Sequence, residues 1–203
     1  MHKQQVVIIH GGTSFAKYSE YLRFLKQEKL TVKKLKQKKG WKFYLGPELG
    51  KGFEVLQPRM PNPMNAKYSE WKLWFEKIIP LLDHEVILVG NSLGGLFLAK
   101  YLSTTIFPKK IRALFLLAAP YSKADKTEDP SDFAKLSSLA RIASQAHNTF
   151  IFHSKDDPLV PVSEAKRYKR ELPTAQLRLF TNKAHFSQEH FPELVRAIKK
   201  MLP

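Results

Sequence analysis

The chain has 203 residues, a hydrophobic share of 43%, no cysteine, and 34 lysines and arginines against 18 aspartates and glutamates, for a formal net charge of +16. This length favours a single domain over residues 1–203 that can bury a core without disulfides or a structural metal. The lack of cysteine excludes thiol nucleophiles, disulfide frameworks and cysteine-based zinc sites, and 12% aromatic residues are atypical of a disordered chain.

The amino-terminal segment and the apolar runs indicate a cytoplasmic protein. Residues 1–5 lead directly into the apolar run 6–9, which is too short for the core of a signal peptide. The longest apolar run, residues 113–119, is far short of the roughly 20 residues that a membrane-spanning helix needs. We therefore expect a cytoplasmic chain with no membrane span.

Runs of β-branched and large apolar residues, bounded by glycine, proline or polar segments, predict strands that are buried on both faces. Between these runs, apolar residues recur at helical spacing. The predicted strands are residues 6–10, 53–57, 85–89, 111–118, 149–153 and 176–180. The predicted helices are residues about 19–28, 66–82, 93–102 and 163–172, a helix from Pro192 onward, and a further helix within 132–146.

The alternation of strands and helices predicts an α/β fold. We expect a three-layer sandwich with a mainly parallel six-stranded sheet and helices on both of its faces. In such sheets, ligands bind at the carboxyl ends of the strands. Candidate catalytic residues are therefore those that directly follow a predicted strand.

A G-x-S-x-G motif, Gly90–Gly94, joins the third predicted strand to a predicted helix. This strand–turn–helix setting is typical of a nucleophile elbow. It places Ser92 at a helix N-terminus, where the helix dipole favours negative charge. The sequence thus predicts Ser92 as a nucleophile, and a glycine-rich turn without a catalytic role is the alternative.

A serine nucleophile needs a base, and the base needs an orienting carboxylate. In the α/β-hydrolase order the acid follows the serine and the histidine comes last. Asp156 and Asp157 follow the fifth predicted strand, and His185 follows the sixth. We favour Asp157 because the rigid segment 158–161 comes directly after it, and Asp156 remains the alternative. The other nearby histidines, His10 and His153, do not fit this order.

The segment His10-Gly11-Gly12-Thr13 follows the first predicted strand, where a backbone N–H can point at a developing oxyanion. We predict the N–H groups of Gly12 and Leu93 as the oxyanion hole, with Thr13 as the alternative to Gly12. Four residues at this edge are weak candidates for substrate-pocket walls, although core packing explains them nearly as well: Met60, Met64, Tyr121 and Phe186.

These residues together give the chain a resemblance to the α/β-hydrolase superfamily. Within it, the chain is similar to the small serine hydrolases related to retinoblastoma-binding protein nine. The matching segments are Ile8–Gly11, Met60–Pro63, Trp71, Gly90–Gly94, Asp156–Pro158 and His185–Phe186. The resemblance implies a compact hydrolase that lacks the superfamily's first two strands, with Ser92, Asp157 and His185 as its triad and with no metal or organic cofactor.

This reading predicts a serine hydrolase that cleaves a small-molecule carboxylic ester through an acyl-enzyme. An amidase or peptidase with the same triad and a non-catalytic binding module on the same fold are the alternatives. Neither a protein partner nor an oligomeric state follows from the sequence.

Three segments depart from the pattern. Ala184 stands where many hydrolases have glycine before the histidine, so we expect that this loop cannot freely use a positive φ. Residues about 29–52 read as a basic insertion, and residues about 121–147 read as a short cap-like segment.

The basic segment contains a lysine run in which Trp41 is embedded: Lys33, Lys34, Lys36, Lys38, Lys39 and Lys42. Such a run is usually a solvated surface. No helix-turn-helix, ribonucleoprotein or zinc-finger signature accompanies it, so we expect no specific nucleic-acid binding.

Overall fold

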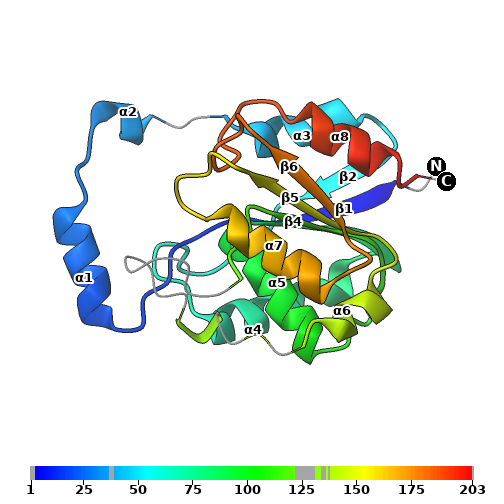
Figure 1. Cartoon of the computed structure of the whole chain (residues 1–203), viewed down its shortest axis with the longest axis horizontal. Coiled ribbons are helices and arrows are strands. Elements are labelled where there is room, and N and C mark those ends of the chain that lie inside the picture. The colour runs from blue at the N-terminus through cyan, green and yellow to red at the C-terminus, as the bar shows by residue number, and fades with distance from the viewer. Residues whose placement is uncertain (1–2, 37–38, 122–130, 134–135, 137, 203) are drawn as a thin grey trace.

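The computed structural model describes residues 3–36, 39–121, 131–133, 136 and 138–202. Its strands form one fully parallel sheet in the order β2-β1-β3-β4-β5-β6. The strands are β1 (Gln4–Ile9), β2 (Phe53–Leu56), β3 (Glu85–Asn91), β4 (Lys110–Leu117), β5 (Thr149–Ser154) and β6 (Gln176–Phe180). The six-stranded parallel sheet predicted from the sequence is confirmed (Figure 1).

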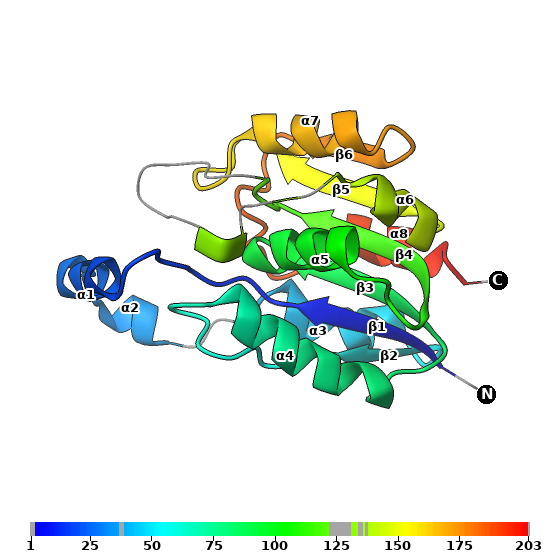
Figure 2. The ribbon, with the colours of Figure 1, turned by 90° about the horizontal axis from the view of Figure 1, so that it is seen from below.

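Helices cover both faces of this sheet, and the strands supply alternate residues to two cores (Figure 2). In β1, for example, Val7 faces one core and Val6 the other, as the two-residue period of a strand requires. Together the two cores confirm the predicted three-layer sandwich. The helices on the first face are α4 (Tyr68–Ile78), α5 (Leu93–Thr104), α6 (Ala140–Gln145) and α7 (Val162–Glu171), and a short 3-10 helix, Ile79–Leu81, follows α4. The helices on the second face are α3 (Trp41–Leu49) and α8 (Pro192–Lys199).

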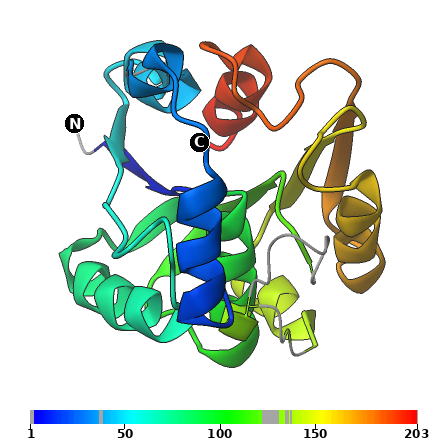
Figure 3. The same ribbon diagram turned by 90° about the vertical axis from the view of Figure 1, so that its left-hand side faces the viewer.

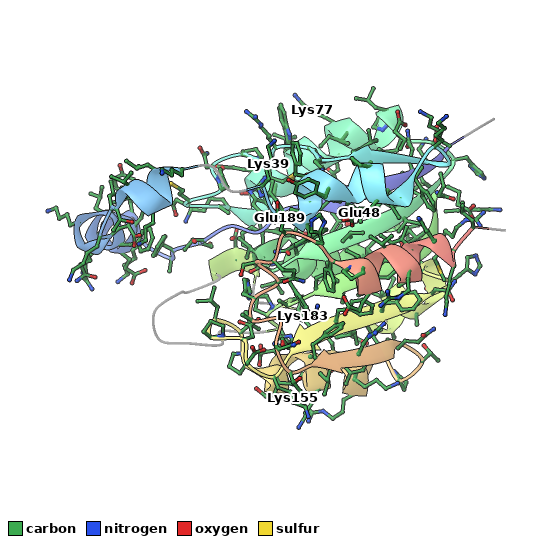
Figure 4. All side chains as sticks on the ribbon, turned by 90° about the horizontal axis from the view of Figure 1, so that it is seen from above. Lys39, Glu48, Lys77, Lys155, Lys183 and Glu189 are labelled. Atoms are coloured by element: carbon green, nitrogen blue, oxygen red, sulfur yellow. The ribbon has the colours of Figure 1, made fainter. Side chains whose placement is uncertain are left out.

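Helix α3 lies within residues 29–52, the segment that the sequence predicts to be a basic insertion. Trp41, Leu45 and Leu49 recur every four residues along it and are all buried in the second core. The Trp41 ring meets the edge of Phe191, at the start of α8, with ring centroids 6.0 Å apart. Figure 4 shows α3 and α8 side by side over the sheet, with the labelled Glu48 of α3 near the seam. Residues 41–49 are therefore part of a helical layer of the fold.

Residues 17–36, called the arm below, stand away from the layers (Figures 1 and 3). The arm contains α1 (Tyr18–Gln27) and α2 (Val32–Leu35), and α1 has no buried residue. It is joined to the body by Phe15, a buried residue whose ring contacts those of Tyr21 and Phe24. The predicted helix 19–28 is confirmed, but it packs on neither face of the sheet.

The segment expected to be cap-like lies partly within the body. Residues 122–130 lie outside the described residues, and within 132–146 the predicted helix is confirmed only for α6. Phe133 and Ile142 are buried in the first core. The Asp132 carboxylate accepts a hydrogen bond from the N–H of Tyr68, at the start of α4, where the helix dipole favours an anion. The described part of this segment therefore packs with the body.

The burial of Trp41 gives a stability prediction. Trp41→Ala should lower the free energy of unfolding by about 3–5 kcal/mol, because it leaves a large cavity between α3 and α8. Leu30→Ala, a change at an exposed arm residue, should stay within about 0.5 kcal/mol of wild type. Urea unfolding followed by circular dichroism measures both. Equal, small effects would mean that α3 is dispensable.

Candidate active site

Ser92 occupies a strained turn between β3 and α5. Its backbone has φ 54° and ψ −124°, a conformation that is costly for a residue with a side chain. The turn is held by two hydrogen bonds, in which the Ser92 N–H donates to the Leu117 carbonyl and the Gly95 N–H donates to the Ser92 carbonyl, each at 2.8 Å. The strand–turn–helix arrangement predicted for the G-x-S-x-G motif is present.

Gly94 allows the end of β1 to approach α5. A Cβ at this position would lie 2.2 Å from the Ile9 carbonyl oxygen and 2.5 Å from that of His10, so no residue with a side chain fits without moving the backbone. The same approach brings the loop after β1 to the serine. A Cβ at Gly11 would lie 3.1 Å from the Cβ of Ser92.

The backbone hydrogen bonds of this loop separate Gly12 from Thr13 as oxyanion-hole candidates. The Thr13 N–H donates to the Pro63 carbonyl at 2.8 Å and is therefore already engaged. For Gly12, no N–H hydrogen bond is recorded among the described residues. Leu93 is the first residue of α5, where an N–H has no acceptor within the helix. The geometry favours Gly12 and Leu93.

His10 fastens the loop after β2 to the loop after β1. The Met60 N–H donates to His10 Nε2 at 2.9 Å, so this nitrogen carries no proton, and Nδ1 donates to the Gly11 carbonyl at 2.6 Å. Burial lowers the pKa of His10; the Gly11 hydrogen bond opposes this shift and the charge of Lys42 adds to it. Both ring nitrogens are thus engaged by backbone, and His10 positions the loop as a neutral ring.

Trp71 holds the same loop from the first face of the sheet. Its indole Nε1 donates to the Pro61 carbonyl at 2.7 Å, and its ring meets that of His10 edge to face at 5.6 Å. The Met60–Pro63 segment and Trp71, which the sequence offered as points of resemblance, therefore form one support for the loop that contains Gly12.

The structure brings Asp157 and His185 together. His185 Nδ1 lies 2.8 Å from Asp157 Oδ2, while the N–H groups of Leu159 and Val160 donate to Asp157 Oδ1 at 2.8 and 3.0 Å. Burial alone would raise the pKa of Asp157, but the hydrogen bonds from His185 and Val160 outweigh it, and the pKa lies below its usual value. An ionised carboxylate thus faces Nδ1 and leaves Nε2 available for a proton. Among the described residues, no hydrogen bond joins Ser92 to His185.

Asp156 has a different set of contacts. Its Oδ1 accepts hydrogen bonds from the Ala184 N–H at 3.1 Å and from the Ser154 hydroxyl. Ser154 Oγ in turn accepts from the Lys183 N–H at 3.0 Å. The Ser154 hydrogen bond lowers the pKa of Asp156, and those from Ala184 and Lys183 act in the same direction. Asp156 therefore tethers the backbone of the histidine loop to the end of β5.

The backbone of Ala184 corrects an expectation from the sequence. Its φ is 42°, and that of Phe186 is 52°, so the loop adopts positive φ on both sides of His185 without glycine. The Asp156 tether holds Ala184. The Phe186 ring is buried and stacks on Phe191 with centroids 4.8 Å apart. These tertiary contacts offset a backbone cost of about 1–2 kcal/mol per residue.

Sequence reasoning missed the role of Trp41 in this site. Its indole Nε1 donates to the Phe186 carbonyl and its backbone N–H donates to the Gln188 carbonyl, each at 3.0 Å. The start of α3 thus fixes the chain just after His185. The Trp41, Leu45 and Leu49 spacing was the available signal, although the surrounding lysines obscured it.

The residues proposed as pocket walls separate into two groups. Met60, Tyr121 and Phe186 are buried in the two cores, and the Tyr121 ring packs on Tyr168 with centroids 5.0 Å apart. The structure therefore favours core packing for these three. Met64 is exposed and lines a cavity of about 500 Å³ beside the Gly12 loop, together with Tyr18, Tyr21, Asn62, Pro63, Asn65, Lys67 and Glu70.

No group of three or more histidine, aspartate or glutamate side chains in the described part of the chain is arranged to hold a metal ion. The acidic and imidazole groups at this edge instead bond to one another and to backbone N–H groups.

Residues 35–195 match the model of the serine hydrolase family. The chain belongs to this family. It is 31% identical over 167 residues to serine hydrolase RBBP9 of Rattus norvegicus, covering 80% of this chain and 87% of the relative. The predicted resemblance to the hydrolases related to retinoblastoma-binding protein nine is therefore confirmed.

Solved structures of other proteins share the fold of this serine hydrolase. The ydeN gene product of B. subtilis superposes with a TM-score of 0.73 at 19% identity, covering 98% of each chain. A monoacylglycerol lipase from Paleococcus ferrophilus gives 0.59 at 16% identity, covering 98% of this chain and 95% of that one. At these identities the two structures support the fold alone.

The strained loop gives a second stability prediction. Ala184→Gly should raise the free energy of unfolding by about 0.5 kcal/mol, because glycine adopts positive φ at little cost but gains entropy in the unfolded chain. Ala197→Gly, in the interior of α8, should lower it by about 1 kcal/mol. Thermal and urea unfolding compare the two variants. A lower free energy of unfolding for Ala184→Gly would contradict the inference that the Ala184 backbone is strained.

Proposed function

We propose that this serine hydrolase cleaves carboxylic esters with Ser92 as nucleophile, His185 as general base and Asp157 as the residue that orients the base. The contact of His185 Nδ1 with the buried Asp157 carboxylate at 2.8 Å carries this proposal. A carboxylate in this position fixes the tautomer with a free Nε2 and stabilises the imidazolium that forms during catalysis.

In the proposed reaction, His185 Nε2 takes the hydroxyl proton as Ser92 Oγ attacks the ester carbonyl carbon. The carbonyl oxygen becomes an oxyanion, and the N–H groups of Gly12 and Leu93 stabilise it. Collapse of this intermediate breaks the ester bond, and His185 returns the proton to the departing alcohol. Water, activated by the same histidine, then hydrolyses the acyl-enzyme and restores Ser92.

The strained backbone of Ser92 supports catalysis over a non-catalytic binding role. A binding module gains nothing from a serine at φ 54°, whereas strain of this kind is concentrated at catalytic sites. Esters are favoured over amides because an alcohol leaves with less help from protonation than an amine does. An amidase or peptidase that uses the same three residues is the second candidate.

Labelling with a fluorophosphonate probe tests the nucleophile. The wild-type protein should be labelled covalently, and Ser92→Ala should not, because the alanine has no hydroxyl to phosphonylate. Ser103→Ala, a change at a buried serine within α5, is the matched control and should label as wild type does. Equal labelling of wild type and Ser92→Ala, or of neither, would rule out Ser92.

Turnover of an ester panel tests the acid. Asp157→Asn should lower kcat by about four orders of magnitude, because an amide at this position favours the wrong histidine tautomer. Asp156→Asn keeps an oxygen that accepts from the Ala184 N–H, so we expect less than a tenfold loss, on the order of one hydrogen bond. A larger loss of kcat in Asp156→Asn than in Asp157→Asn would assign the orienting role to Asp156. Faster turnover of matched anilides than of esters would favour the amidase.

A further inference from the structure

The arm combines exposed apolar side chains with positive charge. Fourteen large hydrophobic side chains are exposed among the described residues, and six of them lie on the arm, with exposed fractions between 39% and 72%. These six are Tyr18, Leu22, Leu25, Leu30, Val32 and Leu35. Residues 17–36 also contain seven basic and two acidic residues, a net charge of +5. An apolar surface of this kind on a protruding segment indicates a binding surface.

The apolar residues are arranged by the helix. Tyr18, Leu22 and Leu25 follow one another at i, i+4 and i+7 and so share one face of α1. Arg23 and Lys26 lie outside this stripe. The result is an amphipathic helix with no buried residue. Tyr21 and Phe24 are half-buried against Phe15, whereas Leu22 and Leu25 are exposed.

The arm is an ordered element. The Lys17 N–H donates to the Glu20 carboxylate at 3.2 Å at the start of α1, and the Lys34 ammonium donates to the Glu28 carboxylate between α1 and α2. Phe15, buried in the body, anchors the other end through its contacts with Tyr21 and Phe24. The apolar and basic side chains therefore lie together on one segment that is held in place by these contacts.

We propose that the arm docks this protein on an anionic membrane surface, with its aliphatic side chains in the interface and its cations against lipid phosphates. An amphipathic helix with lysine and arginine on its polar side binds bilayers in this way, and each cation near an anionic leaflet adds to the attraction. No described helix is long and apolar enough to cross a membrane, so the docking is peripheral.

Charge complementarity favours a membrane over other occupants. A second copy of the chain would bring another +16 and the same positive arm, and like charges oppose that contact. A nucleic acid would neutralise the cations, but it has no apolar layer to cover Leu30, Val32 and Leu35. A bilayer of anionic lipids covers both features.

The position of the arm also determines which part of the body lies nearest to a membrane bound to the arm. The arm leaves the body from the loop after β1, at the sheet edge that contains Ser92 and His185, and Figures 1 and 3 show it in front of that edge. Tyr18 and Tyr21 of α1 line the cavity of about 500 Å³ beside the Gly12 loop. A surface bound to the arm therefore lies close to this cavity.

Sedimentation with vesicles tests the proposal. Wild type should bind vesicles of phosphatidylcholine with 30% phosphatidylglycerol at least about tenfold more tightly than pure phosphatidylcholine vesicles. Leu30, Val32 and Leu35 changed together to serine should weaken binding about tenfold or more, because the apolar anchor is lost. Leu73, Leu81 and Ile106, also exposed, changed together to serine are the matched control and should bind as wild type does.

A second pair of variants tests the charge. Arg23, Lys26, Lys29 and Lys36 changed to glutamine should weaken binding about tenfold or more. Lys51, Lys110, Lys199 and Lys200, exposed residues outside the arm, changed to glutamine remove the same charge and should have a much smaller effect. Ser92→Ala should bind vesicles as wild type does, so the result is independent of the proposed hydrolysis. Circular dichroism confirms that each variant is folded.

Three results would overturn the proposal. The first is no binding of wild type to the anionic vesicles. The second is a dimer in light scattering that the triple serine variant of the arm converts to a monomer, which would assign the apolar face to a second copy. The third is that a short single-stranded RNA displaces the wild-type protein from vesicles and binds the triple serine variant equally well. This result would mean that the arm binds nucleic acid.

Discussion

The contact between the end of β1 and the first turn of α5 is the constraint on which the site depends. Gly94 has no side chain, and any Cβ there would lie within 2.5 Å of the carbonyl oxygens of Ile9 and His10, at the end of β1. Because β1 and α5 pass this closely, the loop that contains Gly11 and Gly12 reaches Ser92 directly. His10 and Trp71 then hold the loop after β2 against it. The proposed oxyanion donor Gly12 and the proposed nucleophile Ser92, which are far apart in the sequence, thus lie close together at this edge of the sheet.

The histidine side of the site depends on the second helical layer. Trp41 of α3 bonds the carbonyls of Phe186 and Gln188, and the Phe186 ring is buried beside Phe191. Burying a phenylalanine side chain contributes about 1.5–3 kcal/mol, which is comparable to the cost of the two positive-φ residues that flank His185. The core between α3 and α8 therefore stabilises a loop conformation that local sequence preferences oppose.

The sequence could predict the features that depend on neighbouring residues, but not those that depend on contacts between distant parts of the chain. The strands were predictable because continuous β-branched runs are a local signal, and Ser92, Asp157 and His185 were candidates because each follows a strand. Helix α3 was obscured by lysines and by Gly46-Pro47 within it. The backbone of Ala184 depends on Asp156, and the engagement of Thr13 depends on Pro63, 50 positions away along the chain. No local pattern encodes these contacts, so the alternatives at those positions stayed open.

The charge of the arm also opposes contact between two copies of the chain. Six exposed hydrophobic side chains on one protruding segment would favour self-association in a neutral protein. Here the arm has a net charge of +5 and the rest of the chain +11, so two copies repel each other at the distances where their apolar faces would meet. The same cations attract an anionic surface. Repulsion between copies and attraction to such a surface are therefore two consequences of one charge distribution, and both weaken as salt screens the arm.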